Sequence, residues 1–413
     1  MKSQTATLFE CADPALIGAS EDEAPAATAP LRVVSVDRAE DFLALAPTWR
    51  TIWDQAHEQS PFNTWEFGSA WYETFVAQRL GGLTGDIQVL IALDQTGRPA
   101  AIAPMFVERN MGRADLGTTL QPFGRSTSVE MMTDEPMMVA RGSSAAAAHA
   151  AFRRFLTGQA PGSAWDLAVT HMPVAAVSHA HGTERRLNAR SVEVVRSYSG
   201  NVSVQLPTSW EQYRRSLSKS MRDNLAYYPR RLRREIGSFS VEIARKPAAV
   251  ALAVDQLVRL HRMRSLAHAG TPHRDHIPSL EHAAFLQQAM VRLARQGLAS
   301  VATLSSTGRV IAAHAFMQTS QGLWTYYSGF NPAWHRFSPL TIITAEVLRD
   351  AIGRGLSTFT FPPGAALWKS RWGGVETRGI SESSIYATRP AALLRGFFRR
   401  RRWRAQMRLD TTA

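Results

Sequence analysis

The side chains best suited to proton transfer lie in the second half of this 413-residue chain. His314 stands in the middle of the apolar run 312–316 (Ala-Ala-His-Ala-Phe), and an imidazole titrates in the range that suits a general base. Tyr326 and Tyr327 follow in the next predicted strand, where regular alternation would turn them to opposite faces. Core packing is the competing interpretation for each of these side chains.

A second group of side chains suits the binding of an acidic or phosphorylated ligand. Lys369 and Arg371 lie close together near the end of the globular region, and Arg222 belongs to a strongly basic predicted helix. Arg336 and Ser338 directly precede another predicted helix, whose first amide N–H groups attract anions. A solvated helix face is the alternative interpretation for Lys369 and Arg371.

Several histidines cluster in one predicted helix–loop–helix segment: His261, His268, His273, His276 and His282. Their spacing reproduces no zinc signature such as H-E-x-x-H. The sequence therefore predicts no metal site, and the segment is expected to face either substrate or solvent.

The elements that position these residues follow one order. Helices are predicted at 248–263 and 280–296, strands at 298–304, 310–318 and 323–330, a helix from Ser338-Pro339 to Gly353 or Gly355, and a strand at 356–361. This order is typical of folds that bind an acyl-pantetheine cofactor. Strand 323–330 would then pair with the pantetheine arm, and residues 331–340 would meet its pyrophosphate. A plain βαβ-type crossover is the alternative.

Ahead of these elements, the sequence predicts a linker near 197–207 and one long basic helix. Thr208-Ser-Trp-Glu211 reads as a capping box that opens this helix. Pro229 should kink or split it, and Gly237 should end it.

A short repeat predicts a duplicated domain. Residues 93–101 (Leu-Asp-Gln-Thr-Gly-Arg-Pro-Ala-Ala) align with 304–312 (Leu-Ser-Ser-Thr-Gly-Arg-Val-Ile-Ala), and predicted strands flank each Thr-Gly-Arg turn. The expected organisation is a disordered acidic tail at 1–30, similar halves at 31–200 and 201–388, and a basic tail at 389–413.

Three segments carry motifs of one known family. They are residues 60–65 (Ser-Pro-Phe-Asn-Thr-Trp) with Trp71, the basic helix 219–237 with Arg222, Asn224, Arg230, Arg231 and Leu232, and residues 327–332 (Tyr-Ser-Gly-Phe-Asn-Pro) followed by Ser338, Pro339, Phe361, Gly364, Trp368 and Lys369. Together they resemble the GNAT-type acetyltransferases of bacterial cellulose and exopolysaccharide biosynthesis, the CelD/BcsL group.

The resemblance implies an α+β chain with a duplicated GNAT-like fold, two mixed-sheet halves flanked by helices. It implies an N-acetyltransferase that moves an acyl group from acetyl-CoA or another acyl-CoA to an amino group of a sugar or glycan precursor, without a metal. We then expect His314, Tyr327 and Lys369 to be catalytic, Tyr326, Gly329, Arg336 and Ser338 to bind the cosubstrate, and Arg222, Trp368 and Arg371 to bind the acceptor.

Two alternatives remain. A Fem-type aminoacyl-tRNA-dependent peptidyltransferase shares the doubled fold and would use the basic helix for tRNA. A non-catalytic glycan-assembly scaffold is favoured by Leu340, where the family has glycine, and by Thr360, where it has aspartate.

The composition indicates which kinds of partner and which cell compartment to expect. Lys and Arg total 47 against 34 Asp and Glu, a net charge of +13 that attracts nucleic acid, anionic lipid or acidic cosubstrates. One cysteine excludes a disulfide framework, and no signal peptide or spanning segment is evident, so a cytoplasmic protein is expected. Residues 393–404 mix arginines with Leu394, Phe397, Phe398 and Trp403, which predicts peripheral contact with an anionic membrane. Nucleic acid is expected only as tRNA under the Fem-type alternative.

Overall fold

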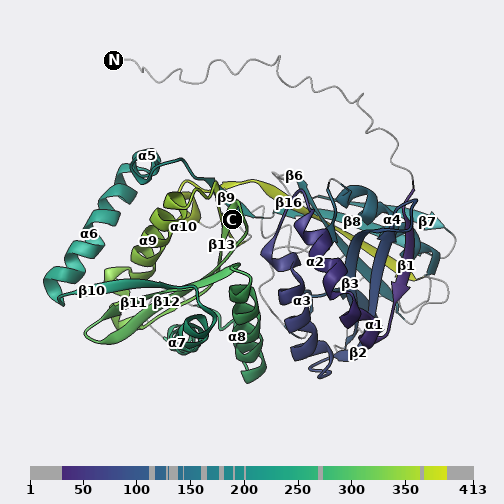
Figure 1. Cartoon of the computed structure of the whole chain (residues 1–413), viewed down its shortest axis with the longest axis horizontal. Coiled ribbons are helices and arrows are strands. Elements are labelled where there is room, and N and C mark those ends of the chain that lie inside the picture. Colours follow the sequence, from purple (N-terminus) through teal and green to yellow (C-terminus); the bar gives the residue numbers. More distant parts are fainter. Residues whose placement is uncertain are drawn as a thin grey trace, which may run out of the picture.

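The computed structural model describes residues 30–110, 117–126, 129, 138–142, 144–159, 165–175, 181–188, 191–199, 201–267, 273–362 and 367–387. The predicted tails at 1–30 (except Pro30) and 389–413 lie outside these residues, as do His268 and Gly364. The described strands form two sheets that lie next to each other, each flanked by helices (Figure 1).

The first sheet has the order β1-β2-β3-β4-β6-β16-β8-β7. Its strands are β1 (Arg32–Val36), β2 (Leu83–Leu93), β3 (Pro99–Asn110), β4 (Gly117–Pro122), β6 (Leu167–Ala175), β7 (His181–Asn188), β8 (Ser191–Ser199) and β16 (Arg378–Ala387), and β5 (Val139–Ala140) pairs with β3. One face packs on α1 (Ala39–Ala44), α2 (Ala46–Asp54), α3 (Trp65–Trp71) and its π-helical continuation Tyr72–Val76, and the other face packs on α4 (Ala145–Gln159).

Alternation along β2 explains this two-sided burial. Val89 and Ile91 join the core under α1–α3, whereas Leu90 and Ala92 join the core under α4. Successive side chains of a strand point to opposite faces, so an almost continuous apolar strand is buried on both sides.

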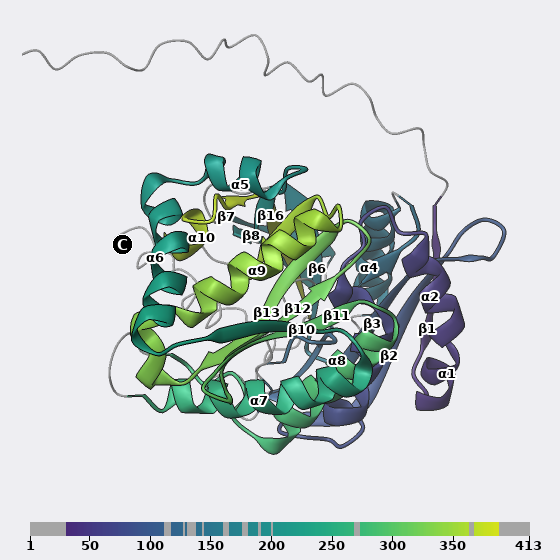
Figure 2. The same cartoon turned by 60° about the vertical axis from the view of Figure 1, so that its left-hand side comes forward.

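The second sheet has the order β10-β11-β12-β13-β14-β9-β15. Its strands are β9 (Val202–Gln205), β10 (Phe239–Ala244), β11 (Ala299–Ser306), β12 (Arg309–Gln318), β13 (Gly322–Phe330), β14 (Thr358–Phe361) and β15 (Val375–Glu376). In Figure 2, α9 (Pro339–Gly353) crosses one face with α6 (Lys219–Glu235) beside it, and α7 (Pro247–Ser265) and α8 (Leu280–Arg295) cover the other.

The two halves repeat the same succession of elements, which confirms the duplication. Each has a strand, helices, an antiparallel three-strand meander, a helix, and a strand that returns parallel to the third strand of the meander. The Thr-Gly-Arg turns occupy equivalent hairpins, β2–β3 and β11–β12, and both glycines have positive φ (+80° at Gly97 and +73° at Gly308). The predicted α+β fold of two similar mixed-sheet halves is therefore correct.

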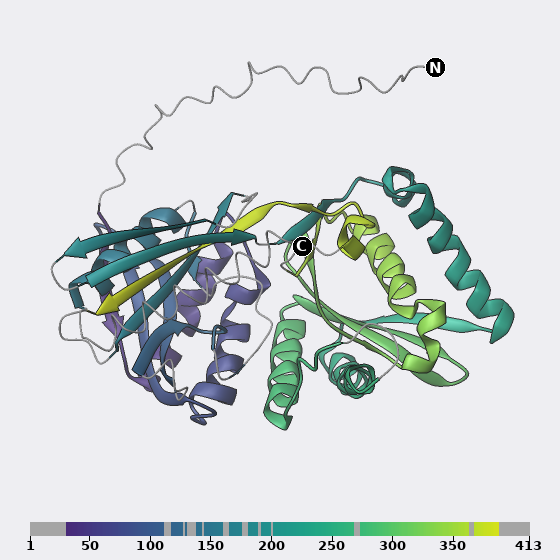
Figure 3. The same ribbon diagram turned by 180° about the vertical axis from the view of Figure 1, so that it is seen from behind.

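One strand of the second half joins the first sheet. β16 lies within the range 201–388 that the sequence assigned to the second half, yet it pairs between β6 and β8 of the first sheet. In Figure 3 it is the yellow strand that runs out of the second half into the first. β9 directly follows β8 in the chain but pairs with β14 in the second sheet. Strand pairing of this kind depends on distant segments, so the local pattern did not reveal it.

Two details of the predicted basic helix are wrong. Ser209, not Thr208, caps the first helix by accepting a hydrogen bond from the Gln212 amide, and α5 (Trp210–Ser216) ends before Ser218 caps α6. Pro229 lies inside α6 without ending it, and the break comes at Leu217, whose backbone is extended (ψ 155°).

A continuous core joins the halves. Phe67 of α3 meets Phe285 of α8 edge to face at 5.3 Å between ring centroids, and Arg292 of α8 donates to Glu73 and to Ser69 of the first half. No helix among the described residues is long and apolar enough to cross a membrane.

Candidate functional site

The parallel strands β13 and β14 separate soon after they start. Their pairing runs only from Gly322↔Thr358 to Trp324↔Thr360, although β13 continues to Phe330. Beyond Trp324, the edge of β13 therefore lines an opening beside the end of β14. We call this opening the β13 cavity.

The β13 cavity has a volume of about 390 Å³. It is walled by β13, α6, the start of α9, the end of α7 and the loop after it, and the segment around α10 (Leu367–Ser370). Its lining residues are Met221, Asn224, Tyr228, His261, Arg264, His273, His276, His314, Thr325, Tyr326, Tyr327, Ser328, Ser338, Leu340, Thr341, Thr344, Pro362, Trp368, Arg371 and Trp372.

A β-bulge places both predicted tyrosines in this cavity. The register of β12 on β13 shifts from His314↔Ser328 to Phe316↔Thr325, so Tyr326 and Tyr327 together oppose the single residue Ala315. The bulge breaks the regular alternation, and the two rings meet at 4.5 Å between centroids. The prediction that the two side chains point to opposite faces of the strand is therefore wrong.

His261 ties the loop after α7 to β13. The amide of His276 donates to His261 Nε2 (3.1 Å), so Nδ1 carries the proton and donates to the Ser328 carbonyl (2.9 Å). This buried imidazole is held in one neutral tautomer, and burial lowers its pKa. We conclude that His261 shapes the wall of the cavity.

Burial keeps the other histidines of the cavity neutral as well. It lowers the pKa of His273 to about 4 and also lowers the pKa of His276, and Arg264 adds like-charge repulsion on both. Arg264 lies under Phe330 at 5.0 Å and donates to the Ser328 hydroxyl at 3.5 Å. Arg264 is thus a half-buried cation within the cavity. Among the described residues, no group of these side chains has the arrangement of a metal site.

His314 lies in the same cavity, and its side chain is buried. Burial lowers its pKa to about 3, and Nδ1 has no hydrogen-bond partner among the described residues. An efficient general base has a pKa near the working pH, so an imidazole with this pKa is a weak base at neutrality. Catalysis by His314 stays a prediction, and packing accounts for its position equally well.

Replacing His314 separates these roles. We expect His314→Gln to lower the rate of acyl transfer by less than about 10-fold, because the native imidazole is too weakly basic to supply a full general-base contribution of ~10²-fold or more. Steady-state kinetics of the purified variant measure this directly. A loss of ~10²-fold with unchanged thermal stability would instead identify His314 as the base.

Only some of the other predicted catalytic and acceptor residues line the β13 cavity. Trp368 and Arg371 line the β13 cavity, and the Trp368 ring packs edge to face on Phe361 at 5.1 Å. Lys369 is buried, donates to the Pro362 carbonyl and lies 5.7 Å from the Trp368 ring centroid. It does not line the cavity, and its observed contacts hold α10 against the end of β14.

Of the residues predicted to bind the cosubstrate, two line the cavity and two do not. Tyr326 and Ser338 line the cavity, and Ser338 precedes α9 in the left-handed conformation (φ 48°) without a side-chain capping bond. Arg336 lies outside the lining residues and pairs with Glu235 at 3.4 Å. Gly329 also lies outside them and packs directly on the backbone of α7.

Arg222 lines a neighbouring cleft between α6 and α9, about 310 Å³ in volume, which we call the arginine groove. Five arginines line the groove: Arg214, Arg222, Arg230, Arg233 and Arg349. One carboxylate, Glu346, also lines it. Asn224, Tyr228 and Thr341 line both the groove and the β13 cavity, so the two spaces adjoin.

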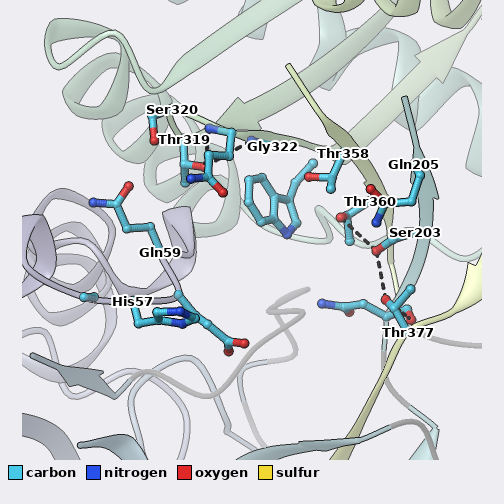
Figure 4. Close-up of a pocket in the computed structure, with 15 residues that line it drawn as sticks. His57, Gln59, Ser203, Gln205, Thr319, Ser320, Gly322, Thr358, Thr360 and Thr377 are labelled. Carbon is cyan, nitrogen blue, oxygen red and sulfur yellow. Dashed lines mark hydrogen bonds between the residues drawn. The ribbon is translucent and has the colours of Figure 1, made fainter. Parts of the chain in front are cut away.

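A third opening lies between the two halves (Figure 4). This central cavity has a volume of about 500 Å³. Its lining residues are Ala56, His57, Glu58, Gln59, Asn201, Ser203, Gln205, Thr319, Ser320, Gln321, Gly322, Trp324, Thr358, Thr360 and Thr377.

Sequence reasoning gave no site role to Arg264, Tyr228, Thr325 or most of the central cavity, and it named Asn224 only as a motif residue. Arg264 lies in the last turn of α7, one residue past the predicted end of this helix at 263, and the packing of α7 on β13 brings it to the cavity. A space in the first half, lined by Met105, His149 and Phe152 among others, measures about 20 Å³. The larger cavities thus involve the second half.

Comparison with known proteins also points to the second half. Residues 219–370 match the acetyltransferase (GNAT) domain family, a range that includes α6, β13, α9 and α10. No curated protein matches the chain.

Several solved structures are similar in fold. The crystal structure of FemX matches with a TM-score of 0.54 at 10% identity, over 83% of this chain and 96% of FemX. A conserved protein of unknown function from Bacteroides thetaiotaomicron has a TM-score of 0.48 at 9% identity, covering 86% of this chain and 100% of that one. A tandem GNAT protein from the clavulanic acid biosynthesis pathway has a TM-score of 0.41 at 8% identity, covering 87% and 99%.

The second half therefore contains a GNAT acetyltransferase domain, and the chain as a whole has a tandem GNAT-like fold. The β13 cavity lies within the segment that matches the family.

Proposed function

We propose that this protein is an acyltransferase that binds an acyl-CoA in the β13 cavity and transfers the acyl group to an amino group. The observation that carries the proposal is the early separation of β13 from β14, which leaves a strand edge along a cavity. An extended chain with amide groups, such as a pantetheine arm, can pair with such an edge. GNAT domains as a class use this kind of donor.

The adjoining arginine groove fits the other end of the same donor. Phosphates favour arginine because the guanidinium forms paired, charge-assisted hydrogen bonds. Asn224, Tyr228 and Thr341 line both spaces, so one elongated ligand can occupy them together. In this proposal the donor's phosphates lie beside α6 and its thioester lies beside Thr325, Tyr326 and Tyr327.

The side chains of the cavity suit the reaction. The amine nitrogen forms a bond to the thioester carbonyl carbon and loses a proton, the C–S bond breaks, and the sulfur leaves as a thiolate that takes up a proton. Tyr327 lies on the bulge with its side chain in the cavity and is our candidate for the proton donor. The neutral histidines of the cavity and the end of α7 surround the Tyr327 side chain and limit its contact with water.

Resemblance supports the remaining details. The segments shared with the CelD/BcsL group favour an acceptor that belongs to a sugar or glycan precursor, and hence a role in polysaccharide biosynthesis. Contact of the basic residues 389–413 with an anionic membrane remains a prediction from sequence.

Donor binding gives the first test. Coenzyme A at 100 times its Kd should stabilise the protein by about 2.7 kcal/mol, which a thermal-shift assay detects. Arg214→Glu combined with Arg230→Glu should weaken CoA binding by roughly 10-fold or more, because like charge replaces two exposed cations of the groove.

The matched control is Arg295→Glu, an exposed arginine of α8 that lines neither space. It should leave CoA binding unchanged, and pantetheine without phosphates should bind the double variant as it binds the natural protein. The absence of any stabilisation by CoA would contradict the proposal.

A Fem-type activity is the second candidate, and the fold similarity to FemX together with the arginines of α6 favours it. In that case aminoacyl-tRNA, and not CoA, should stabilise the protein. The same Arg214→Glu and Arg230→Glu changes would then weaken tRNA binding and reduce its salt dependence.

A further inference from the structure

The central cavity is built by both halves of the chain. His57 and Gln59 lie in the connection between α2 and the turn at Pro61–Asn63, whereas Ser203, Thr358 and Thr360 come from β9 and β14 of the second sheet (Figure 4). Trp53 holds this connection in place, because its carbonyl accepts a hydrogen bond from the side-chain Nε2 of Gln59 at 3.2 Å. A ligand in this cavity would touch both halves.

A row of hydroxyls crosses one wall of the cavity. Ser203 Oγ lies 3.1 Å from Thr360 Oγ1 and accepts a hydrogen bond from Thr377 Oγ1, also at 3.1 Å (Figure 4). Each hydroxyl is both a donor and an acceptor. The row can therefore reorient its hydrogens to match either a donor or an acceptor of a ligand.

An indole lies beside this row. Trp324 lines the cavity with 8% of its surface exposed, and its Nε1–H is buried without an acceptor among the described residues. Gly322 makes room for the ring, because a Cβ at Gly322 would come within 2.8 Å of the indole carbons. An aromatic face with an unused donor thus stands next to several hydroxyls and amides.

The charge of the cavity argues against an anionic ligand. None of the described residues that line it is lysine or arginine, in contrast to the arginine groove, and one of them, Glu58, is a carboxylate. A flat apolar face combined with many uncharged hydrogen-bonding groups matches the chemistry of a sugar ring, whose faces are apolar and whose rim carries hydroxyls.

The central cavity meets the β13 cavity across a single layer of the sheet. Trp324 lines the central cavity, and the next residue, Thr325, lines the β13 cavity and donates to the Thr360 carbonyl at 3.4 Å. The side chain of Thr360 itself faces the central cavity. A group bound there lies on the opposite side of β13 and β14 from the start of α9.

From this arrangement we infer that the central cavity is the acceptor site and binds a polyhydroxylated ligand without negative charge, a sugar unit that carries the reactive amine. The inference rests on the proposed function. The amine would approach the thioester at the junction of Trp324 and Thr325, where β13 and β14 separate. Its nitrogen forms the bond to the carbonyl carbon, the C–S bond breaks, and the proton lost by nitrogen ends on the thiol.

Equilibrium binding to the full chain tests the site without requiring turnover. The probes are cellotetraose, which has the sugar rings but no amine, and the corresponding β-1,4-linked glucosamine tetramer, measured by titration calorimetry. We expect both to bind. Thr377→Val and Gln205→Leu should each weaken that binding by about 10-fold through loss of a hydrogen-bonding group, and Trp324→Leu should weaken it at least as much.

Control variants distinguish a loss of saccharide binding at this site from misfolding and from damage to the donor site. Thr303→Val, on β11 of the same sheet and away from both cavities, should change neither saccharide nor CoA binding. Gln205 is exposed, so Gln205→Leu keeps the test valid if Trp324→Leu fails to fold. All folded variants should bind CoA with an affinity within about 2-fold of the natural protein.

Each outcome decides between the two proposals. Binding of CoA without binding of either saccharide, or saccharide binding that ignores the cavity variants, would overturn the acceptor site and leave the acyltransferase intact. Preference for a lysine-containing tripeptide over both saccharides would likewise overturn it. Saccharide binding that depends on Thr377 and Trp324, without any CoA binding, would support the sugar site and contradict the proposed function.

Discussion

Gly329→Ala should destabilise the protein by about 3 kcal/mol, at the upper end of the cost of overpacking a core. A Cβ at this position would lie 2.3 Å from the His261 amide nitrogen and 2.6 Å from the Leu260 carbonyl carbon, both in the backbone of α7. Backbone cannot rotate away as a flexible side chain can, so α7 must move off β13. Urea unfolding of the variant measures the loss.

The same displacement should affect ligand binding. His261 holds the wall of the β13 cavity through its bond to Ser328, and it follows α7 when the helix moves. Gly353→Ala is the matched control, because nothing lies within 4 Å of a Cβ at that position in α9. It should leave stability unchanged or raise it slightly. If Gly329→Ala is as stable as this control, the close approach of α7 to β13 is not a constraint.

The elements around the site could be predicted from local pattern because each is marked within its own residues. Pro339 at the first helical position and the glycines after α8 and α9 mark helix ends, and strand alternation marks the meander. The repeated Thr-Gly-Arg turn even revealed the duplication, since a two-stranded hairpin needs its glycine at the same place in both halves.

The features that form the site depend on contacts between residues far apart in the chain, so local pattern did not reveal them. The bulge at Tyr326 and Tyr327 exists only in register with β12, so the sequence of β13 alone predicts the wrong faces. The passage of β16 from the second half into the first sheet cannot be seen from its composition. The histidine segment reaches the cavity because His261 bonds across to Ser328, a contact between residues far apart in the chain.

The predicted roles of Arg336 and Gly329 show a related limit. Both lie in the motif segment that resembles the family, yet one pairs with Glu235 and the other packs on α7. A motif marks residues needed in its neighbourhood without distinguishing those that bind a ligand from those that support the walls. Arg222, placed in the groove and not at the acceptor cavity, shows the same ambiguity.

Acidification from about pH 7 to about pH 5 should cost the protein about 2 kcal/mol through His314 alone. Burial lowers the pKa of His314 to about 3 in the folded state, against 6.5 for the free side chain. Between these values the unfolded chain binds more protons than the folded one, so stability falls as the pH drops below about 6.5. His261, His273, His276 and His282 have lowered pKa values for the same main reason and act in the same direction.

Replacing His314 should remove its share of this pH dependence. We expect the difference in the free energy of unfolding between pH 7 and pH 5 to be smaller by about 2 kcal/mol in His314→Gln than in the natural protein, as measured by urea titrations at each pH. His335→Gln, at an exposed position in the turn before α9, should leave the difference unchanged. An identical pH dependence in His314→Gln and the natural protein would mean that this imidazole reaches water in the folded state. In that case it would be available, after all, to exchange protons with a bound amine.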